Sequence, residues 1–303
     1  MSRGEILGIV RVNASGKTTL LRVLLGDVRQ SAGEVKYPSF NEQKKRDWIA
    51  IKRRMAYVSQ TLPRWPGKVY DNLCYVASIY GHPLSEIDAY LDLLLKRYGL
   101  DKFKNATWDE ISGGYKTRFE IVRALVSKPD VLILDEPLAY LDILSQQIVL
   151  RQLRQLARNR ARPIGVIITS QQLYEIEAVA DRLLVLDGGV TLFSDRIQDL
   201  SSIIDDLVVE FTFNGSMMEI KSKLMTHPNF VSMFASETGY IAVFKRRLAG
   251  ANQIDGRADF STILRILGEG QGELIYARDI SKSCRLLFEP RMAERLNLTR
   301  RSH

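Results

Sequence analysis

The stretch ILGIVRVNASGKTTLLRVLL, residues 6–25, reads as a strand, a loop and a helix in direct succession. Its first five residues are apolar and partly β-branched, and the leucines after the loop recur at helical spacing. Gly16, Lys17 and Thr18 stand where the loop meets the helix. Backbone amides and a helix N-terminus at such a junction face bound phosphate groups. The stretch therefore predicts a phosphate-binding loop that follows a buried strand.

The same loop predicts how a nucleoside triphosphate is held. Lys17 is expected to reach the β and γ phosphates, and Thr18 to offer its hydroxyl to Mg²⁺. The motif GKT also occurs by chance on surface turns, so this prediction needs support from elsewhere in the chain. The residues expected to bind the nucleotide here are Asn13, Ala14, Ser15, Gly16, Lys17, Thr18 and Thr19.

A second motif, VLILDE at 131–136, ends an almost wholly apolar strand with two carboxylates. Such a strand is buried on both faces, as in a parallel sheet. Asp135 can hold Mg²⁺ directly or through water, and Glu136 can orient or deprotonate an attacking water. Acidic residues that merely cap a strand end would explain one carboxylate better than two. Together with Lys17, this motif predicts phosphoryl transfer.

Strands and helices alternate through residues 1–203, which is typical of an α/β protein with a parallel sheet and crossover helices. Together with the phosphate-binding loop, this pattern predicts a P-loop NTPase sheet with a helical insertion at about 70–127. Residues 204–290 follow the order β-α-β-β-α-β, with a helix at 217–225, which fits a small C-terminal α+β ferredoxin-like domain. Residues 291–303 are expected to form a basic tail.

The composition narrows the class of protein further. A length of 303 residues favours two domains, and 46% hydrophobic with 26% charged residues excludes a mainly disordered chain. The formal charge of +8 is a moderate excess that usually reflects a solvated exterior. No apolar run is long enough to cross a bilayer and the N-terminus does not fit a secretory signal, so we expect a cytoplasmic protein. Two cysteines and three histidines, widely separated, argue against a disulfide framework or a zinc site.

The segment ISGGYKTR at 111–118 adds a second anion site, because Ser112, Gly113 and Gly114 open a predicted helix. One nucleotide does not need two such sites, but two copies of the chain would use them. Each segment would then close over the nucleotide bound on the partner's Lys17 loop. At this point the sequence resembles the ATP-binding-cassette ATPases, whose signature motif also stands just before the Asp-Glu strand.

The resemblance extends over about residues 4–190 and carries further roles. Gln60, in YVSQ, matches the Q-loop glutamine that senses Mg²⁺, and Asp142, in LAYLD, matches the D-loop that crosses the dimer interface. The stretch 169–189 resembles the switch-loop region, with Gln171 where the family normally has histidine. The resemblance therefore implies ATP and Mg²⁺ as cofactors, bound partly by Gln60, Ser112, Gly113, Gly114 and Asp142. It implies Thr18, Gln60 and Asp135 as metal ligands, and Glu136 and Gln171 as catalytic residues.

The activity implied is that of an ATP-hydrolysing transporter subunit. Two copies of the chain, or this chain and a related ATPase subunit, would dimerise around two ATP molecules and drive a separate transmembrane permease. The permease would hold them at the inner face of the cell membrane. The alternatives are a nucleotide-binding switch with little or no hydrolysis, and an ATPase of this family that acts on nucleic acid through the basic segment 44–54. Relatives of the last kind generally carry two cassettes or a long coiled coil, so no nucleic-acid partner is expected.

Two departures from the family pattern predict slow hydrolysis. Arg11 and Ala14 stand where the family has glycine, and the bulk of Arg11 favours weaker nucleotide binding unless it swings out or adds a useful cation. Gln171 can hydrogen-bond but cannot carry a proton. Loss of one preorganised partner of this kind typically lowers turnover by roughly 10²- to 10³-fold. Neighbouring Gln172 or a shifted loop is the alternative that would compensate.

The sequences near both ends of the chain lead to two further predictions. The C-terminal stretch RDISKSCRLLF, 278–288, resembles the extension on ATPases of the ABC-2 exporter type, although a generic accessory domain would also account for it. Lys17 follows Met1 by only 16 residues, whereas family members have an upstream β segment with an aromatic residue that stacks on adenine. This favours a truncated start, the alternative being that adenine is held in another way.

Overall fold

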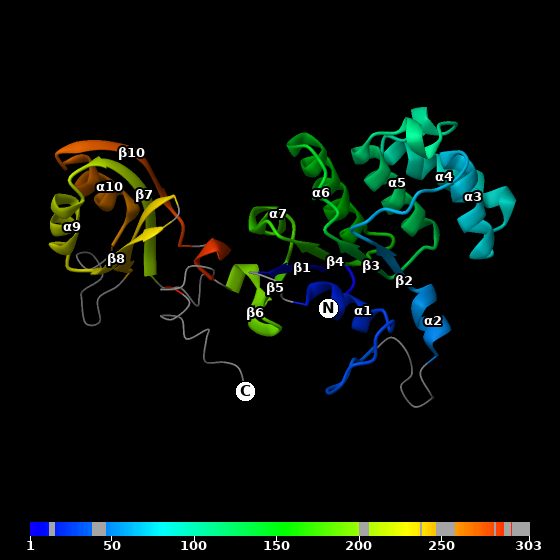
Figure 1. Ribbon diagram of the computed structural model, residues 1–303, viewed down its shortest axis with the longest axis horizontal. Helices are drawn as coiled ribbons and strands as arrows, with labels where there is room; N and C mark the ends of the chain where they lie inside the picture. Colours follow the sequence, from blue (N-terminus) through cyan, green and yellow to red (C-terminus); the bar gives the residue numbers. More distant parts are fainter. Residues whose placement is uncertain are drawn as a thin grey trace. The chain divides into compact units, whose positions relative to one another are not determined.

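The computed structural model contains two compact units, 1–194 and 195–303 (Figure 1). The division falls nine residues before the boundary expected after residue 203. The structure describes residues 1–11, 16–37, 47–199, 206–236, 238–246, 258–281, 283–287 and 292. Most of the expected basic tail, and the Asn13, Ala14 and Ser15 part of the phosphate-binding loop, lie outside the described residues.

The first unit is built on a six-stranded sheet in the order β2-β3-β4-β1-β5-β6. The five strands from β2 to β5 in this order are parallel, and β4 is buried along its whole length, as expected for a strand covered on both faces. The carboxyl ends of these strands consequently meet at one edge of the sheet. The strands are Ile6–Arg11 (β1), Met55–Val58 (β2), Val131–Asp135 (β3), Gly165–Ser170 (β4), Arg182–Asp187 (β5) and Val190–Arg196 (β6).

Helices cover the sheet and form the predicted insertion. Helix α5 packs against both α3 and α4 and also contacts β2, and Figure 1 shows these three helices gathered together. The helices of this unit are Lys17–Leu24 (α1), Trp48–Arg53 (α2), Val69–Ile79 (α3), Leu84–Arg97 (α4), Gly113–Val126 (α5), Ile143–Ala157 (α6) and Leu173–Glu177 (α7). Three 3-10 turns, Asp101–Phe103 (η1), Trp108–Glu110 (η2) and Ile197–Asp199 (η3), complete the described elements before residue 200.

One apolar cluster fixes α1 on the sheet and thereby places the helix N-terminus. Leu21 of α1 packs with Ile9, Ile133 and Ile167, which come from three neighbouring strands and are at most 7% exposed. Full burial of one such side chain stabilises a fold by about 1.5–3 kcal/mol. Lys17 and Thr18, at the start of α1, are therefore held close to the carboxyl ends of these strands.

The second unit has the ferredoxin-like topology that its sequence predicts. Its four-stranded antiparallel sheet runs in the order β10-β7-β9-β8, and two helices pack with β7 and β9 in one core that includes Phe211, Phe244 and Leu267. The elements are Asp206–Gly215 (β7), Met217–Met225 (α9), Phe230–Ser236 (β8), Gly239–Lys245 (β9), Phe260–Gly268 (α10), Gly272–Asp279 (β10) and Cys284–Leu287 (η4). Within the described ranges, no helix combines the length and the hydropathy needed to cross a bilayer.

Candidate functional site

Helix α1 begins directly after Gly16, whose backbone is left-handed at φ 79°. A side chain is disfavoured in that conformation, which glycine adopts at no steric cost. A Cβ at this position would meet nothing within 4 Å, so the turn itself accounts for the glycine. The strand, the turn and the helix start therefore follow the arrangement predicted from residues 6–25. The side chain of Arg11 lies outside the described residues.

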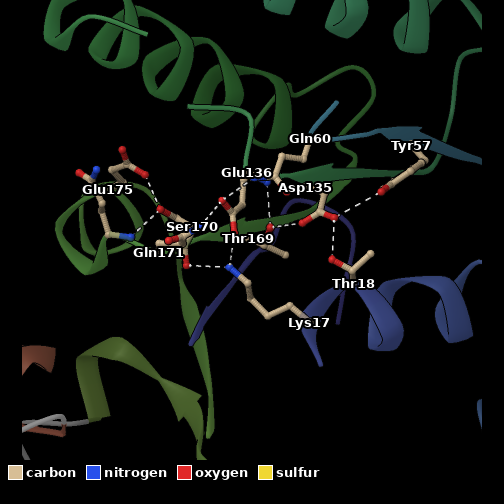
Figure 2. A network of polar contacts seen from close by, with 11 residues as sticks. Lys17, Thr18, Tyr57, Gln60, Asp135, Glu136, Thr169, Ser170, Gln171 and Glu175 are labelled. Carbon is tan, nitrogen blue, oxygen red and sulfur yellow. Dashed lines mark hydrogen bonds and ion pairs between the residues drawn. The ribbon is translucent and has the colours of Figure 1, made fainter. Parts of the chain in front are cut away.

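The ammonium group of Lys17 is buried between the ends of two strands. Its Nζ donates to Glu136 Oε1 at 2.8 Å and to the carbonyl oxygen of Ser170 at 3.3 Å (Figure 2). The Lys17 and Glu136 side chains are only 3% and 7% exposed. A buried charge of this kind is costly unless it is paired. Lys17 is thus held at the edge of the sheet, and its partner is the carboxylate that ends the VLILDE motif.

Asp135 collects three hydroxyl donors. Its Oδ1 accepts from Thr169 Oγ1 at 2.7 Å, while its Oδ2 lies 3.3 Å from Thr18 Oγ1 and 3.4 Å from the hydroxyl of Tyr57 (Figure 2). Burial and the neighbouring Asp135 raise the pKa of Tyr57 to about 12, so the phenol remains a donor. Mg²⁺ prefers oxygen ligands and usually keeps several waters. The hydroxyl of Thr18 and the carboxylate of Asp135 fit such an ion.

The Glu136 carboxylate accepts a hydrogen bond from each of the two predicted glutamines, Gln60 and Gln171. Its Oε2 accepts from Gln60 Nε2 at 3.1 Å and from Gln171 Nε2 at 2.7 Å. Its backbone has φ 49°, an uncommon conformation for a residue with a side chain, and its N–H donates to Thr169 Oγ1 at 2.9 Å. Lys17, Gln60 and Gln171 therefore surround one carboxylate, and Asp135 lies next to it in the chain. Gln60 contacts this carboxylate and not the Thr18–Asp135 pair in the hydrogen bonds of the described residues.

A cavity of about 280 Å³ opens beside Glu136. Its walls include Glu175, a buried carboxylate that accepts a hydrogen bond from Ser170 Oγ. Burial, and to a lesser extent the charge of Glu136, raises the pKa of Glu175. The cavity is large enough for water next to the carboxylate and is lined by Gln60, Glu136, Ala139, Tyr140, Ser170, Gln171, Gln172 and Glu175.

Ser112, Gly113 and Gly114 lie at the exposed start of α5. A Cβ on Gly114 would lie 3.5 Å from Ser145 Oγ, so this segment approaches the start of α6. There Asp142 caps the helix by accepting from Ser145 N–H at 2.9 Å, which lowers the pKa of Asp142. Across the described residues no hydrogen bond joins the Ser112–Gly114 segment to the network around Lys17. The structure thus brings the predicted Ser112 and Asp142 segments together, but separately from the other predicted residues.

The sequence did not reveal every polar residue of the network. Tyr57, Thr169, Ser170 and Glu175 all contribute a contact and none of them was predicted. Three of the four share one signal, a polar side chain at or near the carboxyl end of an apolar parallel strand. That signal is weak alone, because it also marks the ordinary end of a strand.

Comparison with known proteins identifies the family of the chain. Residues 1–139 match the family model described as ABC transporter. The Nod factor export ATP-binding protein I of Rhizobium etli is 30% identical over 73% of this chain and 69% of its own length. The ABC transporter ATP-binding protein NatA of Bacillus subtilis is 28% identical over 66% of this chain and 80% of its own length. Both are named as ATP-binding proteins, one of a transporter and one of an export system, which confirms the resemblance to the ATP-binding-cassette family. The likeness of residues 278–288 to an exporter extension stays a prediction.

An importer subunit is also similar, over nearly the whole chain. The methionine import ATP-binding protein MetN 2 of Paraburkholderia xenovorans is 28% identical over 99% of this chain and 82% of its own length. The structure of cbiO1 from Clostridium perfringens, part of the ABC transporter complex cbiONQ, shares the fold with a TM-score of 0.61 and 23% identity, over 75% of this chain and 86% of that one. The chain therefore belongs to the ABC transporter family, as an ATP-binding subunit that energises a permease.

Proposed function

We propose that the network around Lys17 and Glu136 is where this subunit binds magnesium-ATP and hydrolyses it. The observation that carries the proposal is the 2.8 Å contact between Lys17 Nζ and Glu136 Oε1, with Asp135 and Thr18 beside it. A cation for the phosphates, oxygen ligands for a metal and a carboxylate base then lie at one edge of one sheet.

The residues divide the work of phosphoryl transfer among them. Lys17 leaves Glu136 for the β and γ phosphates, whose charge competes for the ammonium group. Glu136 is then free to accept a proton from a water in the adjoining cavity, and the amides of Gln60 and Gln171 orient that water. Mg²⁺ held by Thr18 and Asp135 would act as a Lewis acid on the phosphate oxygens.

Gln171 is proposed to make this turnover slow. Its Nε2 reaches Glu136 at 2.7 Å, so the side chain orients the carboxylate, but an amide takes up no proton and no charge. A Gln171→His variant should therefore release phosphate faster, by up to about 10²-fold. A nucleotide-binding switch with little or no hydrolysis is the second candidate function, and it is favoured by the same absence of an imidazole at 171.

Dimerisation around ATP is proposed from the placement of Ser112. Ser112 and Gly113 lie exposed, and Gly114 lies half-buried, at the N-terminus of α5, where backbone amides favour an anion. The Ser112–Gly114 segment makes no hydrogen bond to the Lys17 network in the part of the chain that the structure describes. In a dimer, the nucleotide bound to the second subunit would place its phosphate groups at this segment. The same dimer would cover Tyr140 and Ile143, which are 77% and 71% exposed.

The permease is proposed to dock at an open apolar groove of about 540 Å³. Ile49 and Ile79 on its walls are 71% and 60% exposed, which suits an apolar segment of a membrane partner. Docking there would hold the subunit at the inner face of the cell membrane. The groove is lined by Gly26, Trp48, Ile49, Lys52, Arg53, Ile79 and Tyr80.

Phosphate release by wild type and Glu136→Gln tests the enzyme against the switch. We expect the variant to lose at least about 10²-fold of the wild-type rate, because the base is removed while the fold remains. Glu86→Gln, an exposed carboxylate on α4, is the matched control and should keep the wild-type rate. Equal, background-level release by wild type and Glu136→Gln would refute the enzyme and support the switch.

A further inference from the structure

Thr169 stands at the carboxyl end of β4, between the two acidic residues of the site. The register of the parallel sheet pairs Thr169 directly with Asp135 on β3, and the threonine is completely buried. Its hydroxyl lies 2.7 Å from Asp135 Oδ1 and 2.9 Å from the backbone nitrogen of Glu136. One side chain therefore contacts the side chain of Asp135 and the backbone of Glu136.

The direction of both hydrogen bonds follows from the chemistry of the partners. An ionised carboxylate only accepts and a backbone N–H only donates. The hydroxyl proton of Thr169 must therefore point to Asp135, while its oxygen accepts from Glu136. This occupies Oδ1 of Asp135 and leaves Oδ2 on the side of Thr18 and Tyr57 (Figure 2).

We propose that Thr169 is the positioning residue for the magnesium site, acting through Asp135. The threonine holds the carboxylate so that Oδ2 faces Thr18, and it supports the left-handed backbone of Glu136 at φ 49°. Partners that orient metal ligands in this way typically account for 10- to 100-fold in metal affinity or activity. The inference rests on the proposed magnesium-ATP site and adds a fully buried residue that acts through Asp135.

Valine is the substitution that isolates the hydroxyl. Thr169→Val keeps the β-branched shape that suits a buried strand but removes both hydrogen bonds. Thr169→Ser keeps the hydroxyl and loses one methyl group. Thr212→Val is the matched control, because Thr212 lies on β7 in the second unit and its hydroxyl donates to the carbonyl of Thr238 at 2.9 Å.

Calorimetric titration with the ATP analogue AMP-PNP, in Mg²⁺ and in EDTA, measures the contribution of the metal without turnover. In Thr169→Val we expect about 10-fold weaker binding in Mg²⁺ and a change of less than about twofold in EDTA. Thr169→Ser and Thr212→Val should keep the wild-type ratio between the two arms. Thr169→Cys, whose thiol is a weak donor, replaces the valine variant if circular dichroism shows that valine does not fold.

The inference is overturned if the valine or cysteine variant keeps the wild-type ratio, or if both arms weaken equally, which would indicate a purely structural role. Loss of the ratio in Thr169→Ser overturns it as well. A wild type that binds AMP-PNP equally in both arms contradicts the proposed magnesium site, and the role of Thr169 falls with it. If Mg²⁺ strengthens AMP-PNP binding equally in the wild type and in Thr169→Val, the role of Thr169 is refuted but the proposed function is not.

Discussion

Replacing Glu136 by glutamine should destabilise the subunit in the absence of nucleotide. Oε1 of Glu136 accepts from Lys17, and Oε2 accepts from Gln60 and Gln171. A glutamine side chain has one acceptor oxygen and one NH₂ donor. In either orientation of the new amide, its NH₂ group faces a side chain that also donates. That side chain is Lys17 in one orientation, and Gln60 and Gln171 in the other.

The magnitude follows from the two orientations of the amide. If the NH₂ group replaces Oε1, the buried Lys17 loses a charged hydrogen bond worth about 1.5–3 kcal/mol and keeps only its longer contact to Ser170 O. If it replaces Oε2, two amide hydrogen bonds worth about 1 kcal/mol each are lost. Both orientations also remove the charged partner of the buried Lys17 ammonium, which brings the cost to about 3–5 kcal/mol. For a unit of this size, that lowers Tm by about 6–20 °C.

Thermal unfolding followed by circular dichroism measures this shift without nucleotide. Glu86→Gln, on the exposed face of α4, serves as the control and should stay within about 0.5 kcal/mol of wild type. AMP-PNP with Mg²⁺ should raise the Tm of Glu136→Gln by more than that of wild type, because Lys17 then regains a negatively charged partner. A nucleotide-free Glu136→Gln subunit that melts with the wild type would refute the reasoning that the three donors depend on this carboxylate.

Three further changes test other parts of the first unit. Gly8→Ala places a methyl group 2.1 Å from Ile176 Cγ2, so urea unfolding should show a loss of about 2 kcal/mol; an unchanged midpoint would contradict this packing. Glu120→Ala removes the buried carboxylate that accepts hydrogen bonds from Arg123 Nε and from the indole N–H of Trp65. The free energy of unfolding should fall by about 2 kcal/mol in the same assay, and by less in Glu120→Gln. Burial raises the pKa of Glu175 above its ordinary value of 4.5. The protonated carboxyl therefore contributes to the free energy of unfolding in full below pH 4.5, and this contribution is lost as the pH rises through the pKa of the folded protein. Glu175→Gln should abolish this difference between unfolding free energies at low and neutral pH, and an unchanged pH profile would argue against it.

Elements with a strongly buried face were the clearest to predict from the sequence, whereas an exposed strand gave a weaker pattern. The helix expected at 217–225 matches Met217–Met225 residue for residue, because Ser216 caps it and an apolar face packs in the core. β3 was recognised by its continuous apolar run. β6 was missed, since Val190–Arg196 is mostly exposed and therefore shows neither a run nor an alternation.

Residues of the site could be predicted from the sequence where a charged side chain comes directly after an apolar strand. Lys17 and Glu136 lie more than one hundred residues apart, but both follow strands of one parallel sheet, and the carboxyl ends of such strands meet. Thr169 also stands at the end of an apolar strand, but that signal alone did not single it out. Its role depends on the register that sets it opposite Asp135, and that register arises only when β3 and β4 pair.

The ion pair between Lys17 and Glu136 also bears on the order of events at the proposed site. While the pair is intact, the Lys17 ammonium and the Glu136 carboxylate neutralise each other, so neither would be available for its proposed role. Only a competing anion can separate them without leaving a buried charge alone, because that cost would otherwise be several kcal/mol. A triphosphate supplies this anion, whereas water entering the cavity does not. In the proposed mechanism, binding of the nucleotide would therefore be the step that frees Glu136 to act on water.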